Sequence, residues 1–289
     1  MSAFVLVSLL LARVVPGFTS TLTEVVVVAV IVLSYDVALR RLGSPVLMQP
    51  GVLALAAWVT GVVLGWNTSP VIALLVAIVA GVLAASSLLA IPAAVGSAGL
   101  VMGGLALTVV LTDVVPPVPG FAPPVFLGID LGTPTAALVA ALLALALGAW
   151  VWRMLLTQDL GRWLLAAKHA PNLVARGGVS PRAVTAAGLA LAGGLAGLAG
   201  WAAAVATLGG PVTRAVDPSL ALAWIAATLV VGPGMAGVLG GALVFVLLSK
   251  VAVAVGLSPL LLLGPLTAGL LWRQAGGLRQ SARAGGIRS

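Results

Sequence analysis

Long, nearly uninterrupted runs of Leu, Ala, Val and Gly dominate this chain, and the run from Pro134 to Trp152 contains no charged residue. A run of about 20 apolar residues crosses a bilayer as a helix. Lipid leaves backbone polar groups without partners, so only helices and closed barrels span it. The runs are continuous rather than alternating, which excludes a transmembrane barrel. Because 62% of the residues are hydrophobic and 7% are charged, we predict an all-α polytopic membrane protein.

The apolar runs predict about ten transmembrane helices in one domain that covers residues 1–289. Arg13 lies inside the first run and no clear cleavage site follows, so we interpret this run as a helix rather than a cleaved signal. The runs at 51–65 and 219–231 are short enough to be half-helices that line a cavity. The predicted spans are 3–18, 22–39, 51–65, 69–90, 95–112, 134–152, 183–206, 219–231, 236–256 and 259–272.

Several of these spans begin with a side-chain oxygen followed by proline. The oxygen can accept a hydrogen bond from a free backbone N–H, and proline has no N–H to leave unpaired in the first turn. These pairs therefore mark helix starts more reliably than hydropathy alone. They are Ser69-Pro70, Thr133-Pro134, Ser180-Pro181, Asp217-Pro218 and Ser258-Pro259.

Lys and Arg concentrate on the cytoplasmic side of membrane proteins. A cytoplasmic N-terminus places most basic residues inside, and it places Glu24, Asp113, Asp130 and Asp217 outside. We therefore predict that both termini are cytoplasmic, with a basic tail over 273–289. The basic residues expected inside are Arg40, Arg41, Arg153, Arg162, Lys168, Arg176, Arg182, Arg273, Arg279, Arg283 and Arg288.

Side chains for catalysis or metal binding are scarce. The only histidine is His169, there is no cysteine, and the carboxylates are scattered singly, so we expect no metal site and no catalytic residue. The stretch from Gly232 to Gly237 fits G-x-G-x-x-G, but it joins two apolar runs and lacks the strand and acid of a dinucleotide site. No ATP-binding Lys-Ser/Thr motif is present, so we expect no cofactor in this chain. The net charge is +8, but aromatic residues are not interleaved with the basic ones as they are on a nucleic-acid-binding surface. The charge therefore does not indicate nucleic-acid binding.

Pairs of small residues four apart let helix backbones approach closely. Such pairs occur at Gly61–Gly65, Gly193–Gly197 and Gly237–Gly241. Packing inside one subunit is the favoured interpretation of these pairs, and a role between subunits is the alternative.

The one long polar interruption, residues 157–182, predicts two short helices at the cytoplasmic surface. Asp159 suits a helix start, Pro171-Asn172 breaks the helix, and Gly177-Gly178 forms a natural C-cap after a turn over 173–176. Two interpretations are open: an interfacial anchor, which the pattern alone favours, or a helix pair that enters a cleft on a soluble motor. The apolar face is Leu160, Trp163, Leu164 and Ala167, with Arg162 and Lys168 pointing away.

The segment from Gly161 to Val205 resembles the cytoplasmic loop and following helix of branched-chain amino acid ABC transporter permeases. A second block, from Ser219 to Leu248, resembles the late glycine-rich segment of that family. The resemblance covers residues 22–272 in the length and order of spans, and it is specific only between 157 and 248. The matching positions are Gly161, Arg162, Ala166, Ala175, Arg176, Gly178, the run Leu195–Gly200, and Gly232, Gly234, Gly237 and Gly240.

The region before the third span departs from the family pattern. Asp36 stands where Asn is usual, and Met48 and Gln49 stand where Gly and His are usual. The resemblance implies that this segment lies near the translocation path, so the transported solute stays open and the subunit is a candidate for the less typical half of a heterodimer. Asp36 and Gln49 are the candidate path residues, although a capping or interfacial role is the simpler interpretation of each.

The resemblance implies the transmembrane subunit of an importer in a bacterial or archaeal cytoplasmic membrane. Its partners would be a second permease subunit (in a heterodimer, or alternatively a homodimer), two cytoplasmic ATPases that hold ATP and Mg, and an extracytoplasmic solute-binding protein. The ATPase-coupling residues would be Asp159, Gly161, Arg162, Ala166, Lys168, Ala175, Arg176 and Gly178. The alternatives are a permease for sugars, nucleosides or other solutes, and a secondary transporter or membrane scaffold without ATPases.

Overall fold

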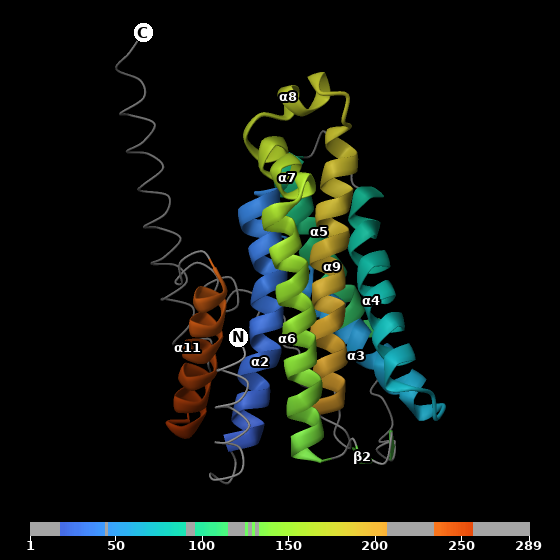
Figure 1. Cartoon of the computed structure of the whole chain (residues 1–289), viewed down its shortest axis with the longest axis vertical. Helices are drawn as coiled ribbons and strands as arrows, with labels where there is room; N and C mark the ends of the chain where they lie inside the picture. The colour runs from blue at the N-terminus through green and yellow to red at the C-terminus, as the bar shows by residue number, and fades with distance from the viewer. Residues whose placement is uncertain are drawn as a thin grey trace.

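The protein is a helical bundle (Figure 1), seen in a computed structural model that describes residues 18–43, 46–90, 96–114, 125–126, 129–130, 133–206 and 234–256. The α-helices are α2 (Phe18–Asp36), α3 (Gln49–Gly65), α4 (Pro70–Ser86), α5 (Gly96–Val114), α6 (Pro134–Thr157), α7 (Asp159–His169), α8 (Pro171–Arg176), α9 (Pro181–Ala206) and α11 (Met235–Ala254). A π-helical segment, η1 (Val37–Leu42), continues α2, and a 3-10 segment, η2 (Ser87–Ala90), continues α4. Two short antiparallel strands, β1 (Val125–Phe126) and β2 (Ile129–Asp130), follow α5.

Five described helices are long and apolar enough to cross a membrane: Thr19–Leu42, Pro70–Ala90, Pro134–Thr157, Pro181–Ala206 and Met235–Ala252. Two shorter apolar helices, Gln49–Gly65 and Gly99–Asp113, accompany them. The predicted helical architecture is therefore confirmed in its broad form, apart from the two short strands, and these helices agree with the predicted membrane protein. The predicted number of ten spans stays a prediction, because the ranges 3–18, 219–231 and 259–272 lie outside the described residues, apart from Phe18 at the start of α2.

The Ser/Thr-Pro pairs begin helices as predicted. Ser69 Oγ accepts a hydrogen bond from the backbone N–H of Val71 at the start of α4, over 3.3 Å. Thr133 Oγ1 accepts from the N–H of Ala136 at the start of α6, over 3.2 Å. α9 begins at Pro181, directly after Ser180. The other two pairs lie outside the described residues.

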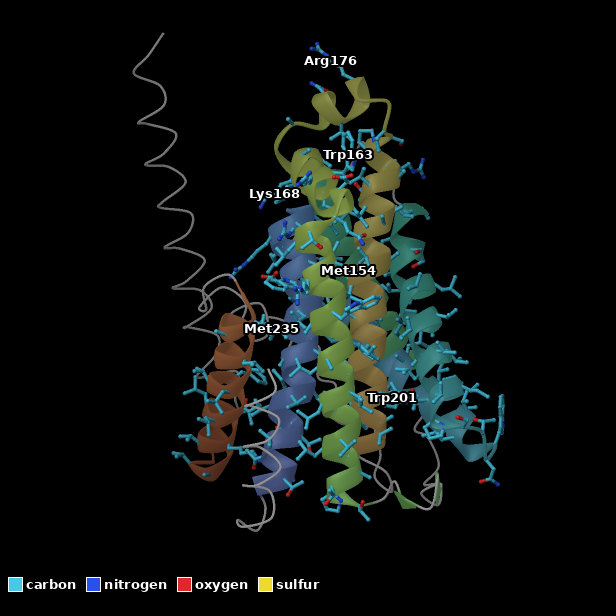
Figure 2. The ribbon with its side chains drawn as sticks, in the orientation of Figure 1. Met154, Trp163, Lys168, Arg176, Trp201 and Met235 are labelled. Atoms are coloured by element: carbon cyan, nitrogen blue, oxygen red, sulfur yellow. The ribbon has the colours of Figure 1, made fainter. Side chains whose placement is uncertain are left out.

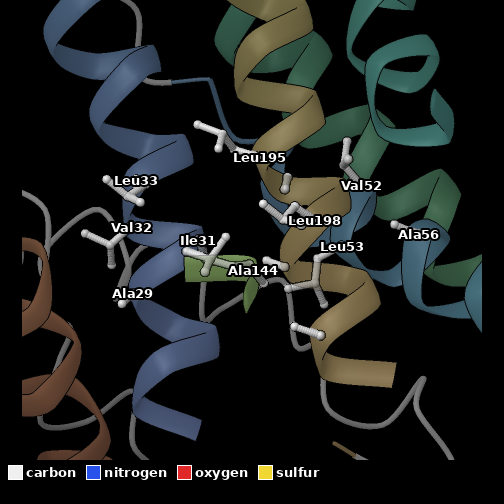
Figure 3. Close-up of a cluster of buried hydrophobic side chains, with 14 of the residues drawn as sticks. Ala29, Ile31, Val32, Leu33, Val52, Leu53, Ala56, Ala144, Leu195 and Leu198 are labelled. Atoms are coloured by element: carbon white, nitrogen blue, oxygen red, sulfur yellow. The ribbon is translucent and has the colours of Figure 1, made fainter. Parts of the chain in front are cut away.

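Helix α9 lies at the centre of the described bundle and contacts α2, α3, α4 and α6. Gly193 and Gly197 lie against α4, where a Cβ on Gly193 would overlap Gly81 O and a Cβ on Gly197 would lie 2.5 Å from Ala77 O. Gly200 makes a similar close approach to Leu53 O of α3. These glycines bring the backbones together, and the Leu, Val and Ile side chains around them fill the core (Figure 3).

The side of the bundle is apolar and exposed along several helices. Exposed Val, Leu and Ile side chains follow α4, α6 and α11 along their length. A surface of this kind suits lipid rather than water, since soluble proteins rarely expose such large apolar patches. Helix length, composition and surface therefore agree on a protein that lies in a membrane.

Candidate functional site

Helices α7 and α8 cross one end of the bundle (Figure 1), which we name the α7 end. The chain turns sharply from α6 into α7 at Gln158, whose φ of −97° and ψ of 160° are extended. A Cβ on Gly161 would overlap Leu155 O. Only glycine lets α7 lie so close to the last turn of α6. The predicted coupling residue Gly161 is therefore buried and has a packing role.

Helix α7 presents an apolar face to the bundle, as its spacing predicts. Leu164 is fully buried, and Leu160, Trp163 and Ala167 are partly buried against the core. A Cβ on Gly188 of α9 would meet both Leu164 and the η1 residue Leu42. The helix thus rests in a notch between η1 and α9, and Figure 2 shows Trp163 turned toward the bundle.

Helix α8 packs on α7, and a glycine turn follows it before α9. Val174 is fully buried, and the ring of Trp163 lies against Gly177. Gly178 has a φ of +77°, and its N–H donates to Ala175 O over 3.1 Å. The predicted C-cap at Gly177-Gly178 is confirmed. The second helix was expected to start near residue 173, but it starts at Pro171 because the fixed φ of proline suits a first helical turn.

The outer face of the α7–α8 pair is polar and mostly cationic. Asp159 and Arg162 form an exposed ion pair of 3.3 Å, with side chains 81% and 79% exposed. Surface pairs of this kind contribute little stability, so both groups are free to meet a partner. Ala166 is half-buried at the edge of this face. The other exposed predicted residues are Lys168, Ala175, Arg176 and Gly178.

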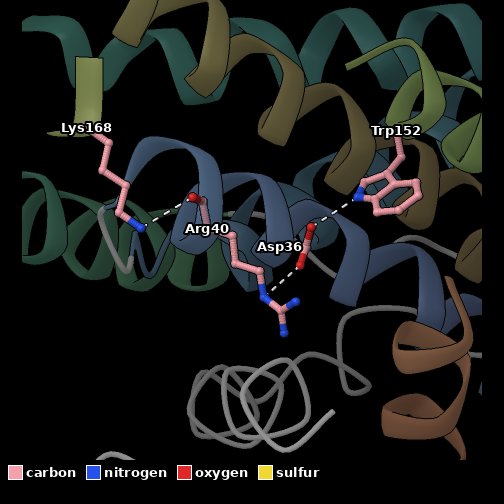
Figure 4. A network of polar contacts seen from close by, with 4 residues as sticks. All are labelled: Asp36, Arg40, Trp152 and Lys168. Carbon is pink, nitrogen blue, oxygen red and sulfur yellow. Dashed lines mark hydrogen bonds and ion pairs between the residues drawn. The ribbon is translucent and has the colours of Figure 1, made fainter. Parts of the chain in front are cut away.

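Beneath α7, the π-helical segment η1 is held by contacts from three elements (Figure 4). Lys168 Nζ donates to Arg40 O over 3.3 Å. Asp36 Oδ1 pairs with Arg40 Nε over 3.1 Å, and Asp36 Oδ2 accepts from Trp152 Nε1 over 3.1 Å. π-Helical turns often occur at functional sites. Asp36, a predicted path residue, thus lies in a network that connects α2, η1 and α6.

The segment ends at Gly43, whose φ of +72° is left-handed. Its N–H donates to Ala38 O, and a Cβ there would lie 2.7 Å from Lys168 Cγ. The left-handed φ favours glycine at this position. The Lys168 side chain therefore packs over Gly43, the residue that follows η1.

Helix α3 begins in the interior of the bundle, with Gln49, Pro50 and Gly51 buried. A Cβ on Gly104 of α5 would lie 2.9 Å from Leu47 N and 3.1 Å from Met48 N. Counted from Gly96, Gly104 is the ninth residue of the 19-residue α5, which places it about 12 Å along the helix axis. The first turn of α3 therefore lies against the middle of α5.

Thr108 of α5 bonds to the backbone where α3 begins. Its Oγ1 accepts from Gly51 N over 3.3 Å and donates to Leu47 O over 2.7 Å. Irregular backbone in a membrane interior needs such partners from the protein. Thr108 is not among the predicted site residues. In the sequence it is one hydroxyl inside an apolar run, and no pattern indicates that its partners lie 57 and 61 positions away.

Gln49, the second predicted path residue, is the first residue of α3 and is 0% exposed. Among the described residues, neither Nε2 nor Oε1 of its side chain has a hydrogen-bond partner. An unbonded buried amide costs on the order of 1–3 kcal/mol. A capping or interfacial role, the simpler expectation, does not describe this side chain.

Within the described ranges, no three His, Cys, Asp or Glu residues lie together as a metal site would require. The candidate site therefore consists of the α7–α8 surface, the η1 segment beneath it and the first turn of α3. No known protein family matches the chain, and neither a curated protein nor a solved structure matches it.

Proposed function

We propose that this chain is a transmembrane permease subunit of an ABC importer for branched-chain or related amino acids, and that α7 and α8 dock a partner ATPase. The proposal rests on how the α7–α8 pair packs against the bundle. Its apolar face packs on the bundle through Leu164 and Val174, and its cationic face is exposed. The match of Gly161, Arg162, Ala175 and Arg176 to the family loop agrees with this role.

The distribution of charge supports a cytoplasmic α7 end. Arg153, Arg162, Lys168, Arg176 and Arg182 are all exposed at or beside this end. At the other end of α2, Glu24 pairs with Lys250 of α11 over 3.2 Å, so the opposite end carries no comparable excess of positive charge in the described residues. Positive charge marks the cytoplasmic side, which is the side where ATPases act.

The contacts beneath α7 provide a route from the docking surface into the membrane part. Lys168 of α7 bonds to Arg40 O of η1, and Leu164 of α7 and Leu42 of η1 both lie against Gly188 of α9. In the sequence, Gly43 follows η1 and the start of α3 at Gln49 is six residues further on. A displacement of α7 by a partner would therefore move η1 and, through it, the start of α3. Packed elements with two arrangements are the physical means by which such coupling occurs.

Energy for transport would come from the partners. Two ATPases would bind and hydrolyse ATP with Mg, a second permease subunit would complete the path, and an extracytoplasmic binding protein would deliver the solute. ATP and the loaded binding protein must each bind one state of the permease more tightly than the other. Within this chain, the α7–α8 surface and η1 would carry the motion of the ATPases into the membrane part.

A secondary transporter without ATPases is the second candidate function. The buried carboxylate of Asp36 favours it, because ion-coupled carriers place functional charges inside their spans. Its bonds to Arg40 and Trp152 weigh against that function, since a carboxylate held by two partners is suited to positioning. Solute uptake that persists without any ATPase would select this second candidate.

Copurification with an ATPase tests the proposal. Arg162→Glu reverses one exposed charge on α7 and should reduce recovery of the ATPase by about tenfold, since a charge-assisted contact contributes about 1.5–3 kcal/mol. Arg153→Glu, at an exposed position of α6, is the matched control and should leave recovery unchanged. Equal recovery from wild type and Arg162→Glu would contradict docking through α7.

A further inference from the structure

The first turn of α3 combines two features that rarely occur together. It is a helix N-terminus buried inside the bundle, and it carries a fully buried amide, Gln49, without a partner among the described residues. The nearby hydroxyl of Thr108 is already committed to Gly51 N and Leu47 O. The backbone of the turn is therefore held in place, while the Gln49 side chain is available to a ligand.

The chemistry of this turn selects a particular kind of ligand. A helix N-terminus carries partial positive charge and favours an anion, and membrane transporters use interrupted helices in this way for carboxylates. A glutamine amide donates through Nε2 and accepts through Oε1. One group that offers an anionic acceptor beside a cationic donor is the zwitterionic head of an α-amino acid.

We propose that the first turn of α3 binds this zwitterionic head inside the bundle, with Gln49 Nε2 donating to the carboxylate and Gln49 Oε1 accepting from the ammonium. The inference rests on the proposed import function and names the site where the solute is held. Met48 and Val46 are fully buried beside this turn, and they provide apolar surface for an aliphatic side chain of the solute. Thr108 acts as a positioning residue that fixes the turn.

Access to this site requires α5 to move. Helix α5 packs on α3, and its opposite face is apolar and exposed at Met102, Leu105 and Val109. It is the peripheral wall of the site. The approach of Gly104 to the backbone of Leu47 and Met48 closes the site in the state described. The solute would enter only when the transport cycle separates this wall from α3.

The absence of cysteine allows a direct test by single thiols in the full complex with its ATPases and binding protein. Met48→Cys places a thiol beside Gln49 and leaves the amide intact. We expect a small thiol reagent to label it during ATP turnover, and saturating L-leucine to slow the labelling by about tenfold. Leucinamide, which lacks the carboxylate, should not protect. Thr60→Cys, at another fully buried position of α3, is the control and should show no leucine-dependent protection.

A substitution at Gln49 separates binding from stability. Gln49→Met is similar in size and removes an unbonded buried amide, so the melting temperature should stay equal or rise. We expect it to abolish leucine protection at Met48→Cys and to lower leucine uptake by about tenfold. If Gln49→Met keeps both protection and uptake, Gln49 is only a buried amide and the site is overturned.

The same samples separate this inference from the proposed function. ATP-driven leucine uptake by the wild-type complex tests the function alone. Uptake without protection at Met48→Cys would overturn the site and keep the function. Leucine protection without ATP-driven uptake would support the binding site and contradict the proposed import function.

Discussion

Lys168 Nζ of α7 donates a hydrogen bond to Arg40 O of η1 over 3.3 Å. The two residues are 128 positions apart in the chain. The bond ties the surface proposed to dock an ATPase to the segment that leads into α3. It follows that Lys168 should contribute to the coupling of ATP hydrolysis to transport more than to docking itself.

Lys168→Met tests this division of roles. Methionine keeps an aliphatic stem over Gly43 but removes the bond to Arg40 O. We expect ATPase recovery to stay at the wild-type level and the number of solute molecules moved per ATP to fall several-fold, as the loss of one charged hydrogen bond implies. Lys168→Arg retains a cationic donor and should restore much of the coupling. A normal transport ratio in Lys168→Met would show that this contact carries no motion.

Gly161→Ala tests the turn between α6 and α7. An added Cβ would overlap Leu155 O, so the backbone must shift, at a cost of about 1–3 kcal/mol. Thermal unfolding in detergent should show a lower melting temperature. Gly65→Ala is the control, because its Cβ would meet nothing within 4 Å, and it should be neutral or slightly stabilising. Equal melting temperatures for the two variants would contradict the packing described.

Thr108→Val tests the support of the α3 start. The change keeps the shape of the side chain and removes the hydroxyl that serves both Gly51 N and Leu47 O. Each buried group left without a partner costs about 1–3 kcal/mol, so the melting temperature should fall clearly. Thr112→Val is the matched control, since within the described residues that hydroxyl bonds only to Thr108 O and Val109 O of its own helix. A similar small loss for both variants would show that Thr108 is not a special support.

Gly197→Ala tests the contact between α4 and α9. Its Cβ would lie 2.5 Å from Ala77 O, which requires the two helices to separate. We expect a loss of about 1–3 kcal/mol in unfolding free energy. Gly194→Ala also faces α4, but its Cβ would meet only the side chain of Val82, at an ordinary 3.4 Å, and that of Ile78 beyond it. The Gly194→Ala control should be nearly neutral. A larger loss of unfolding free energy in Gly194→Ala than in Gly197→Ala would contradict a close helix contact at Gly197.

Much of the helical framework could be predicted because its signals are local. Apolar runs set the helices, and the oxygens of Ser69 and Thr133 mark helix starts within a few residues of their partners. The amphipathic face of α7 follows from the spacing of Leu160 and Leu164 for the same reason. Gly161 lies on a predicted short helix and Asp36 near the end of a predicted span, but the sequence does not indicate the contacts that either residue makes.

The remaining features depend on contacts distant in sequence. Ser34 Oγ donates to Ala192 O over a separation of 158 residues, and no local pattern indicates that pairing. The π-helical geometry of η1 was also not predicted, because its sequence reads as the end of an ordinary apolar helix. The turn of α3 in the bundle interior depends on Thr108, whose role appears only when α5 is placed beside it.

Crosslinking from the α7–α8 surface tests the central claim most directly. Ala175→Cys carries the only thiol in the chain and lies exposed on α8. Trp66→Cys is exposed in the turn between α3 and α4, and Figure 1 shows that turn at the end of the bundle away from α7. Membranes treated with a short thiol-to-amine crosslinker should give an adduct between the Ala175→Cys chain and an ABC ATPase, identified by mass spectrometry. Trp66→Cys should give no such adduct. An Ala175→Cys chain that crosslinks to no ATPase, in membranes where the chain is folded and inserted, would contradict the account.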